Sequence, residues 1–190
     1  DSTRFNVYNT TFGGSITGAG SLIVDGLSKV QLTGANTFSG GATIVGGTLV
    51  AGGASTSSGG AITSSPLGTG TVTVASGGSF DFAGYAVNNN IAASGTGSNS
   101  TGAIQNSTGS VTTSANISLN GGATFNVAGT GLSLTGTVTD GSSAGAITKA
   151  GSGALTLGGS NTYSGGTTVR AGNVVAGSAS TSSGGALTSG

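Results

Sequence analysis

The sequence predicts an all-β protein whose chain winds into a parallel β-helix (β-solenoid) of about nine coils. Three observations predict this fold. A long segment recurs at a fixed offset, short stretches alternate apolar and polar residues, and glycine pairs separate those stretches. Self-similarity at a fixed period is typical of stacked repeat architectures, and at roughly 20 residues per coil the 190 residues make about nine coils.

A segment of 35 residues recurs at an offset of 125 positions, since residues 30–64 align without a gap with residues 155–189, and 22 of the 35 pairs are identical. We therefore predict that residues 1–190 are one solenoid segment of a longer array. Residues 1–20 would end one unit, residues 21–145 would form a full unit of 125 residues, and residues 146–190 would begin the next. The motif residues are mostly apolar or glycine: Leu32, Gly34, Asn36, Phe38, Gly40, Gly41, Ile44, Gly47 and Leu49 in the first copy, and Leu157, Gly159, Asn161, Tyr163, Gly165, Gly166, Val169, Gly172 and Val174 in the second.

The alternating stretches have the period of two that is typical of strands. No window favours a helix, because glycine and β-branched residues occur throughout. Glycine pairs and Asp-Gly pairs predict positive φ at the corners between strands. The predicted strands cover residues 22–24, 30–32, 71–74, 80–82, 117–119, 125–127 and 155–157, and the corners include residues 25–26, 40–41, 77–78 and 121–122.

The same alternation assigns twenty apolar side chains to the interior of the solenoid. At about 1.5–3 kcal/mol for each fully buried side chain, they offset much of the conformational entropy lost on folding, which the 41 glycines make large. The predicted interior residues are Leu22, Val24, Val30, Leu32, Phe38, Ile44, Leu49, Val72, Val74, Phe80, Phe82, Ile117, Leu119, Phe125, Val127, Leu155, Leu157, Tyr163, Val169 and Val174.

Composition argues against several classes of partner. Four basic and four acidic residues leave no net charge, so nucleic acid and anionic membrane surfaces are not expected as partners. No run of about 18 apolar residues occurs, so this segment is not expected to insert into a membrane. The chain has no cysteine, which excludes a disulfide framework and favours an exported chain.

Residues 155–172 (Leu-Thr-Leu-Gly-Gly-Ser-Asn-Thr-Tyr-Ser-Gly-Gly-Thr-Thr-Val-Arg-Ala-Gly) resemble the autotransporter-associated β-strand repeat, also called the passenger-associated transport repeat. Residues 147–153 fit the usual lead-in to that repeat. The first copy, residues 30–47, departs from the pattern at Gly46-Gly47 and has Val45 where the second copy has Arg170. The resemblance implies a right-handed parallel β-helix passenger, located outside the cell or on the bacterial outer-membrane surface.

Little in the sequence points to catalysis. The chain has neither histidine nor cysteine, and its four carboxylates, Asp1, Asp25, Asp81 and Asp140, are scattered. We predict turn roles for Asp25 and Asp140, and an outward orientation for Asp81 because it lies between two inward phenylalanines. No catalytic, cofactor-binding or metal-binding residues and no cofactor are expected. A β-helix enzyme that acts on polysaccharides is a weaker alternative.

Three residue sets have both a structural and a functional interpretation. Asn36 and Asn161 are expected to cap turns or stack in ladders rather than to bind a ligand. Phe38 and Tyr163 are expected to fill the core rather than to stack on carbohydrate. A Thr71–Thr73 pair could belong to an ice-binding face, but such a face needs the pair on every coil and the sequence shows it clearly once.

The sequence therefore predicts a non-enzymatic structural segment of an exported protein. It would be a rigid rod that serves as a passenger, stalk or adhesive fibre. The alternative is a subunit of an extracellular filament that self-associates end to end or laterally. Contacts with a surface glycan or with a host protein are the other expected partners.

Overall fold

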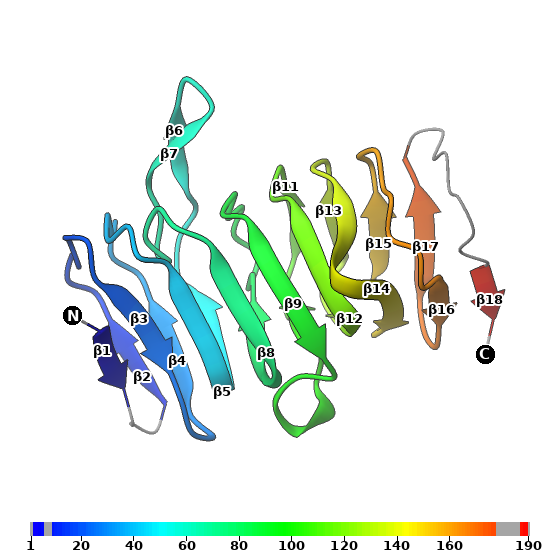
Figure 1. Cartoon of the computed structure of the whole chain (residues 1–190), viewed down its shortest axis with the longest axis horizontal. Helices are drawn as coiled ribbons and strands as arrows, with labels where there is room; N and C mark the ends of the chain where they lie inside the picture. Colours follow the sequence, from blue (N-terminus) through cyan, green and yellow to red (C-terminus); the bar gives the residue numbers. More distant parts are fainter. Residues whose placement is uncertain (1, 6–8, 178–186, 190) are drawn as a thin grey trace.

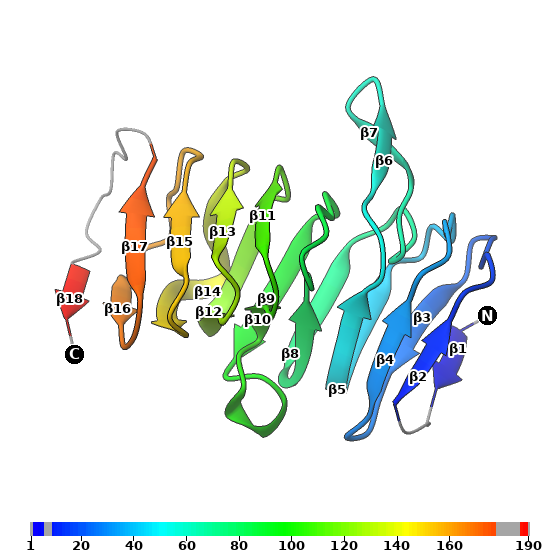
Figure 2. The ribbon, with the colours of Figure 1, turned by 180° about the vertical axis from the view of Figure 1, so that it is seen from behind.

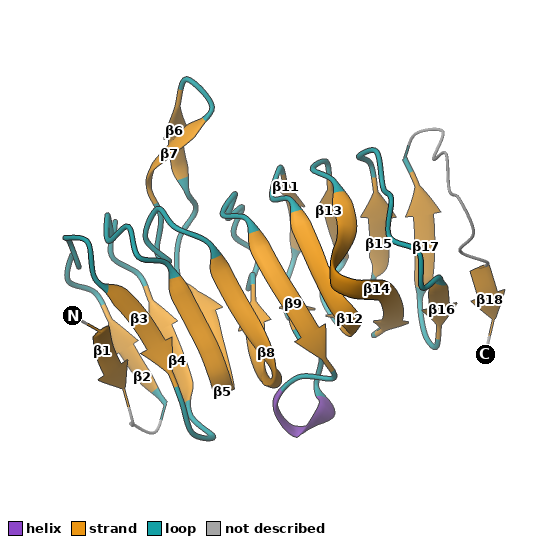
Figure 3. Cartoon of the chain, viewed as in Figure 1, coloured by secondary structure: helices purple, strands orange, loops and turns teal. Residues whose placement is uncertain are grey.

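The computed structural model describes residues 2–5, 9–177 and 187–189. The regular structure of these residues consists of strands and a single short 3₁₀ turn, η1 (Ser98–Ser100), joined by loops (Figure 3). The all-β prediction is confirmed. Part of the repeated segment, residues 178–186, lies outside the described residues, as does Asp1.

The strands follow one another along the chain with short connections. They are β1 (Ser2–Phe5), β2 (Thr10–Phe12), β3 (Ser21–Val24), β4 (Lys29–Leu32), β5 (Ala42–Ala51), β6 (Thr56–Ser58), β7 (Ala61–Ser64), β8 (Val72–Asp81), β9 (Ile91–Gly95), β10 (Ile104–Asn106), β11 (Ser110–Thr113), β12 (Ile117–Val127), β13 (Gly131–Leu134), β14 (Val138–Ala150), β15 (Ala154–Leu157), β16 (Thr167–Val169), β17 (Asn173–Ala176) and β18 (Leu187–Ser189).

Parallel pairing stacks these strands into three rows along a solenoid of about eight turns, close to the number predicted (Figures 1 and 2). Row A contains β1, β3, β9 and the N-terminal halves of β5, β8, β12 and β14. Row B contains β2, β4, β10, β16, β18 and the C-terminal halves of the same four long strands. Row C contains β11, β13, β15 and β17.

Side chains of like type stack inside each row. In row B, Leu49 pairs with Phe80, Phe80 with Ile104 and Ile104 with Phe125, and all four side chains are fully buried. Each coil therefore shields the apolar side chains of its neighbours from water, as expected for a solenoid whose units cannot bury a core alone.

The predicted interior is largely confirmed. Seventeen of the twenty side chains are buried, and Tyr163, Val169 and Val174 are half-buried. Tyr163 and Val174 pack against the margin of the core. Among the described residues β17 pairs with β15, and Leu155 is the register partner of Val174.

The predicted strands all lie on observed strands, with Thr71 and Phe82 one residue outside β8. Positive φ is found at Gly26 and Gly41, as predicted for the corners, and at Gly121, which lies at an irregularity inside β12 and not between two strands. The same prediction was wrong for residues 77–78, which continue β8. Glycine is needed at position 78 for a different reason, because a Cβ atom there would collide with the backbone carbonyl of Ile44.

One element that the sequence reasoning missed is an antiparallel hairpin formed by β6 and β7. It projects from the row of coils (Figure 1). Gly59 and Gly60 form its two-residue loop with φ of 58° and 84°, the pattern of a type I′ turn. A two-residue Gly-Gly loop between short strands is a hairpin signal, and it could have been found in the sequence.

Candidate functional site

The candidate site is the repeat motif, which folds as a corner loop between two strands in each copy. In the first copy the loop connects β4 to β5, and in the second it connects β15 to β16. The motif glycines bring this loop against the preceding coil. A Cβ atom at Gly34 would collide with the carbonyl oxygen of Gly14, and one at Gly159 with that of Gly136. The two copies therefore use glycine for the same close backbone contact.

Asn36 ties three successive coils together. Its side-chain oxygen accepts a hydrogen bond from the Ile16 backbone N–H at 2.8 Å, and its amide donates to the carbonyl of Pro66 at 2.6 Å. Its backbone also pairs with Ser65 in an isolated antiparallel bridge. The side chain is fully buried, so these bonds satisfy groups that cannot reach water.

Asn161 has the same role toward the preceding coil and a different one on its other side. Its side-chain oxygen accepts a hydrogen bond from the Val138 backbone N–H at 2.9 Å. Its amide donates to Gly159, within its own loop, at 2.8 Å. Both asparagines bind backbone groups, which supports the structural interpretation over a ligand contact.

The aromatic motif residue packs on the core in both copies. Phe38 is buried, whereas Tyr163 is half-buried and its hydroxyl lies 2.6 Å from Thr167 Oγ1. The residue equivalent to Thr167 in the first copy is Ala42. The second copy therefore has both the tyrosine hydroxyl and its threonine partner, whereas the first copy has neither.

The other motif residues complete the loop and the strand that follows it. Leu32, Ile44, Leu49 and Leu157 are buried. Gly41, Gly47, Gly166 and Gly172 have positive φ. Gly40 and Gly165 lie against the carbonyl oxygens of Gly20 and Gly145. Val169 and Val174 are half-buried. The motif thus builds a corner and contributes to the core.

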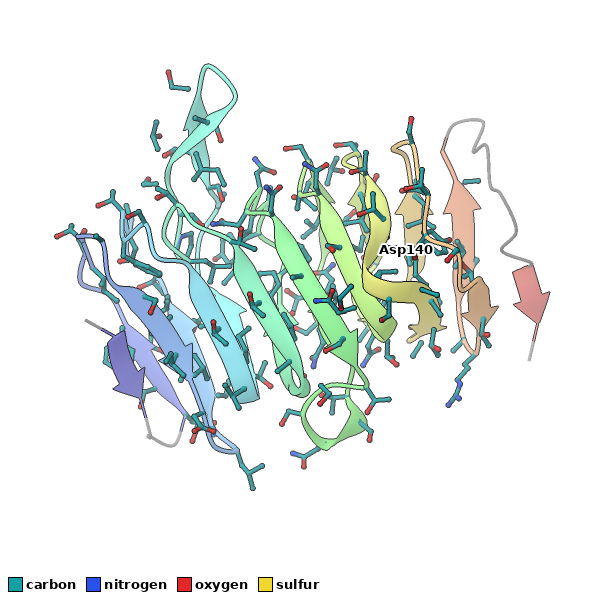
Figure 4. The ribbon with its side chains drawn as sticks, viewed as in Figure 1. Asp140 is labelled. Atoms are coloured by element: carbon teal, nitrogen blue, oxygen red, sulfur yellow. The ribbon has the colours of Figure 1, made fainter. Side chains whose placement is uncertain are left out.

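Asp140, which lies on the coil next to the second copy, binds that copy through hydrogen bonds from Ser164 (Figure 4). Its Oδ1 accepts hydrogen bonds from the backbone N–H groups of Gly145 and Ser164, and its Oδ2 accepts one from the Ser164 hydroxyl. The bond from Gly145, and then those from Ser164, hold the pKa of this carboxyl below its ordinary value. Asp140 lies within β14 and not in a turn, so the predicted turn role was wrong, and the carboxylate instead links two coils.

Asp25 accepts a hydrogen bond from the Gly26 backbone N–H, in agreement with a turn role. Asp81 alternates with the buried rings of Phe80 and Phe82 as predicted, but the side chain does not reach solvent. It is 3% exposed and accepts hydrogen bonds from the backbone N–H groups of Ala83 and Ser107. The following turn and the next coil cover it, so the side chain alternates with the inward rings and yet is buried.

Sequence reasoning missed Lys149, whose side chain is fully buried in row B. Its backbone pairs with Phe125 on one side and Val169 on the other. The ammonium donates to the carbonyls of Ala150, Gly151 and Ala171 at 2.6, 2.8 and 3.2 Å. Burial lowers the pKa of this group. Alternation of side chains along the strand from Ile147 predicts that position 149 faces the interior. Lysine is charged, however, and this argued against placing it in the core.

The described residues contain no group of three or more histidine, cysteine or acidic side chains that could hold a metal ion. Within the same residues, no helix is long and apolar enough to cross a membrane. Thr73 pairs with Thr43 on one side, but this row of two threonines ends at Ala92 next to Thr73 and at Ile23 next to Thr43. The geometry of an ice-binding face therefore does not extend along row A.

The family model for the passenger-associated-transport-repeat matches residues 16–51 and 147–176, which include all motif residues of both copies. No curated protein and no solved structure matched the chain.

Proposed function

We propose that this chain, which carries two passenger-associated transport repeats in one β-solenoid, is a structural, non-enzymatic segment of an exported bacterial surface protein. It acts as a rigid rod, in the manner of a passenger or stalk, and holds other parts of the parent protein away from the cell. The predicted unit boundaries at residues 20/21 and 145/146 belong to this proposal.

The observation that carries the proposal is the continuity of the backbone ladders. Rows A and B run from the first strands to β14 and β18, and their buried side chains form one core cluster. Bending such a rod would break many hydrogen bonds and expose the apolar column at once. A stiff spacer is the function that this arrangement supports best.

The charged side chains support the non-enzymatic part of the proposal. Asp81 and Asp140 each accept two backbone hydrogen bonds, and the Lys149 ammonium donates to three carbonyls. Their bonds hold these groups within the framework of the solenoid. A general acid or base must instead present its proton to a substrate.

Surface labelling of cells that produce the parent protein tests the proposal. An antibody raised against this chain should label intact cells, and external protease should remove the signal while a cytoplasmic marker survives. Small-angle X-ray scattering of the purified chain should give an elongated particle. Labelling that requires permeabilised cells would overturn the export part, and a compact sphere would overturn the rod.

One observation favours lateral self-association as a second role. Leu27 and Val45 are 81% and 46% exposed, and they flank Gly26 and Gly46, which lie against each other at one corner of neighbouring coils. A chain with no net charge offers little repulsion between copies. Light scattering should show concentration-dependent association that Leu27→Ser with Val45→Thr reduces. A strictly monomeric rod at high concentration would contradict this role.

A further inference from the structure

An open cleft of about 460 Å³ lies between the projecting hairpin β6–β7 and the solenoid. The hairpin lies beside the turn that joins β8 to β9 (Figures 1 and 2). Ala61 and Ile62 line the cleft on the hairpin side, and Thr69, Thr71, Asn88 and Asn90 line it on the solenoid side. The volume falls in the range of small-molecule sites, about 300–1,000 Å³.

The two asparagine side chains on the solenoid wall have fixed orientations. The Ser114 backbone N–H donates to Asn88 Oδ1, and only an oxygen can accept that bond. The Thr137 backbone N–H likewise fixes Asn116 Oδ1, so Asn116 Nδ2 must donate to Asn90 Oδ1. Successive coils therefore decide which end of each amide is oxygen.

This arrangement leaves two NH₂ groups available as donors. Within the described residues, no hydrogen bond occupies Nδ2 of Asn88 or Asn90, or the hydroxyls of Thr69 and Thr71. Asn90 and Thr71 are exposed, and Asn88 and Thr69 are half-buried. Because the asparagine oxygens are held by the next coils, the free donors require no reorganisation before they bind an acceptor.

The composition of the cleft selects an uncharged ligand. None of its lining residues carries a charge, so a phosphate, sulfate or carboxylate would lose its hydration without gaining a counter-charge. Amide donors and hydroxyls suit a ligand rich in oxygen acceptors. Ile62 and Ala61 on the facing wall provide an apolar surface for C–H groups.

We propose that this cleft binds a neutral oligosaccharide, through hydrogen bonds from Asn88, Asn90, Thr69 and Thr71 and through apolar contact with Ile62. The inference rests on the proposed function for its setting, because a rod on the cell surface meets extracellular glycans. The rod then contributes contacts along its side, at the coil that carries the hairpin.

Titration of the ¹⁵N-labelled chain, followed by NMR, tests the site. The probes are chitotetraose and cellotetraose, which are neutral, and tetragalacturonate, which is acidic. At least one neutral probe should shift the side-chain NH₂ signals of Asn88 and Asn90 in a saturable manner. Absence of a saturable shift with both neutral probes would overturn the proposal, as would equal or stronger binding of tetragalacturonate.

Two point variants locate the contact. Asn90→Asp keeps the oxygen that accepts from Asn116 and removes the NH₂ donors, and Thr71→Val removes a hydroxyl with little change of shape. Each should raise the dissociation constant of the probe about fivefold. The controls Asn173→Asp and Thr112→Val make the same changes at exposed positions of β17 and β11 and should leave it unchanged. Equal effects from variants and controls would contradict the assigned site.

A shortened hairpin tests whether the hairpin side of the cleft contributes to binding. Thr56 and Ser64 are paired, so replacing residues 57–63 by Asn-Gly closes a two-residue loop and leaves the coils intact. Binding should be lost while the backbone spectrum of the coils is retained. If the shortened chain binds as well as the original, the cleft is not the site. These experiments use purified protein, so their failure is distinct from failure of surface labelling on cells.

Discussion

The two copies of the motif have nearly the same sequence but lie on different sides of the solenoid. In the first copy the strand after the loop, Ala42–Ile44, pairs within row A with Leu22–Val24. In the second copy the equivalent strand, β16, lies in row B. It pairs with β14, and β14 pairs with β12. β12 in turn pairs with β10, where Phe125 is opposite Ile104. The 125-residue offset therefore does not correspond to a whole number of turns. The motif is a corner that can be built on more than one side.

The neighbours of each copy differ accordingly. Asn36 is bonded to a coil on each side, through Ile16 and Pro66, while Asn161 is bonded to Val138 and to its own loop. Asp140 holds Ser164 in the second copy, whereas the equivalent Ser39 donates its backbone N–H to the Gly18 carbonyl. One loop sequence thus accepts different partners, because its own backbone geometry is set by its glycines.

The largest expected difference between the copies concerns their asparagines. Asn36→Ala leaves a backbone donor and a buried carbonyl in two different coils without partners, and should lower the free energy of unfolding by about 4 kcal/mol. Asn161→Ala should cost about half as much, because Gly159 lies in a half-buried loop near water. Urea unfolding measures both. Equal losses would mean that the bond to Pro66 contributes little.

Glycine should matter equally in both copies. Gly34→Ala and Gly159→Ala each place a Cβ atom against a carbonyl of the preceding coil, and each should cost about 3 kcal/mol. Unfolding midpoints compare the pair. Gly14→Ala serves as the control, because a Cβ atom there meets nothing within 4 Å. A loss for one motif glycine alone would show that the two corners differ in backbone geometry.

The aromatic positions should show coupling with the fourth residue after them. Phe38→Tyr buries a hydroxyl beside Ala42, which offers it no partner, and should cost about 2 kcal/mol. Adding Ala42→Thr supplies the partner that Tyr163 has in the second copy, and should recover about 1 kcal/mol. The measurement is a double-mutant cycle. If the two changes in the free energy of unfolding are strictly additive, the hydroxyl pair does not explain why Tyr163 and Thr167 occur together.

The smallest expected effect is a dependence on acid that is confined to the second copy. The pKa of Asp140 is lower in the folded chain, so its stabilising contribution is present above the ordinary pKa of an aspartic acid and is lost as the pH falls through the folded value. Hydrogen exchange at the Ser164 amide should therefore speed up in acid, relative to its intrinsic rate. The Ser39 amide should not change. Asp140→Asn should remove the difference, and a response shared by both amides would contradict it.

The core and the corners follow from local sequence. Alternation predicts the interior because successive side chains of a strand point to opposite faces, and seventeen of twenty assignments are confirmed by burial. The motif asparagines and Phe38 likewise have the structural roles that their positions favoured. These features depend on residues a few positions apart, which are visible in one stretch of chain.

Other features depend on which coil lies next, and the sequence does not specify that locally. Ile62–Ser64 lies in the antiparallel strand β7, whereas the aligned Leu187–Ser189 forms β18 and pairs in parallel with β16. Lys149 is tolerated in the core because carbonyls of its own turn and of Ala171 surround its ammonium, and Asp81 is covered by the following turn and coil. Composition and period therefore determined that the chain forms a solenoid and which side chains face inward. The tertiary structure alone decided on which side each motif lies and which polar groups it meets, because those partners are many residues away and are set by the summed lengths of the intervening coils.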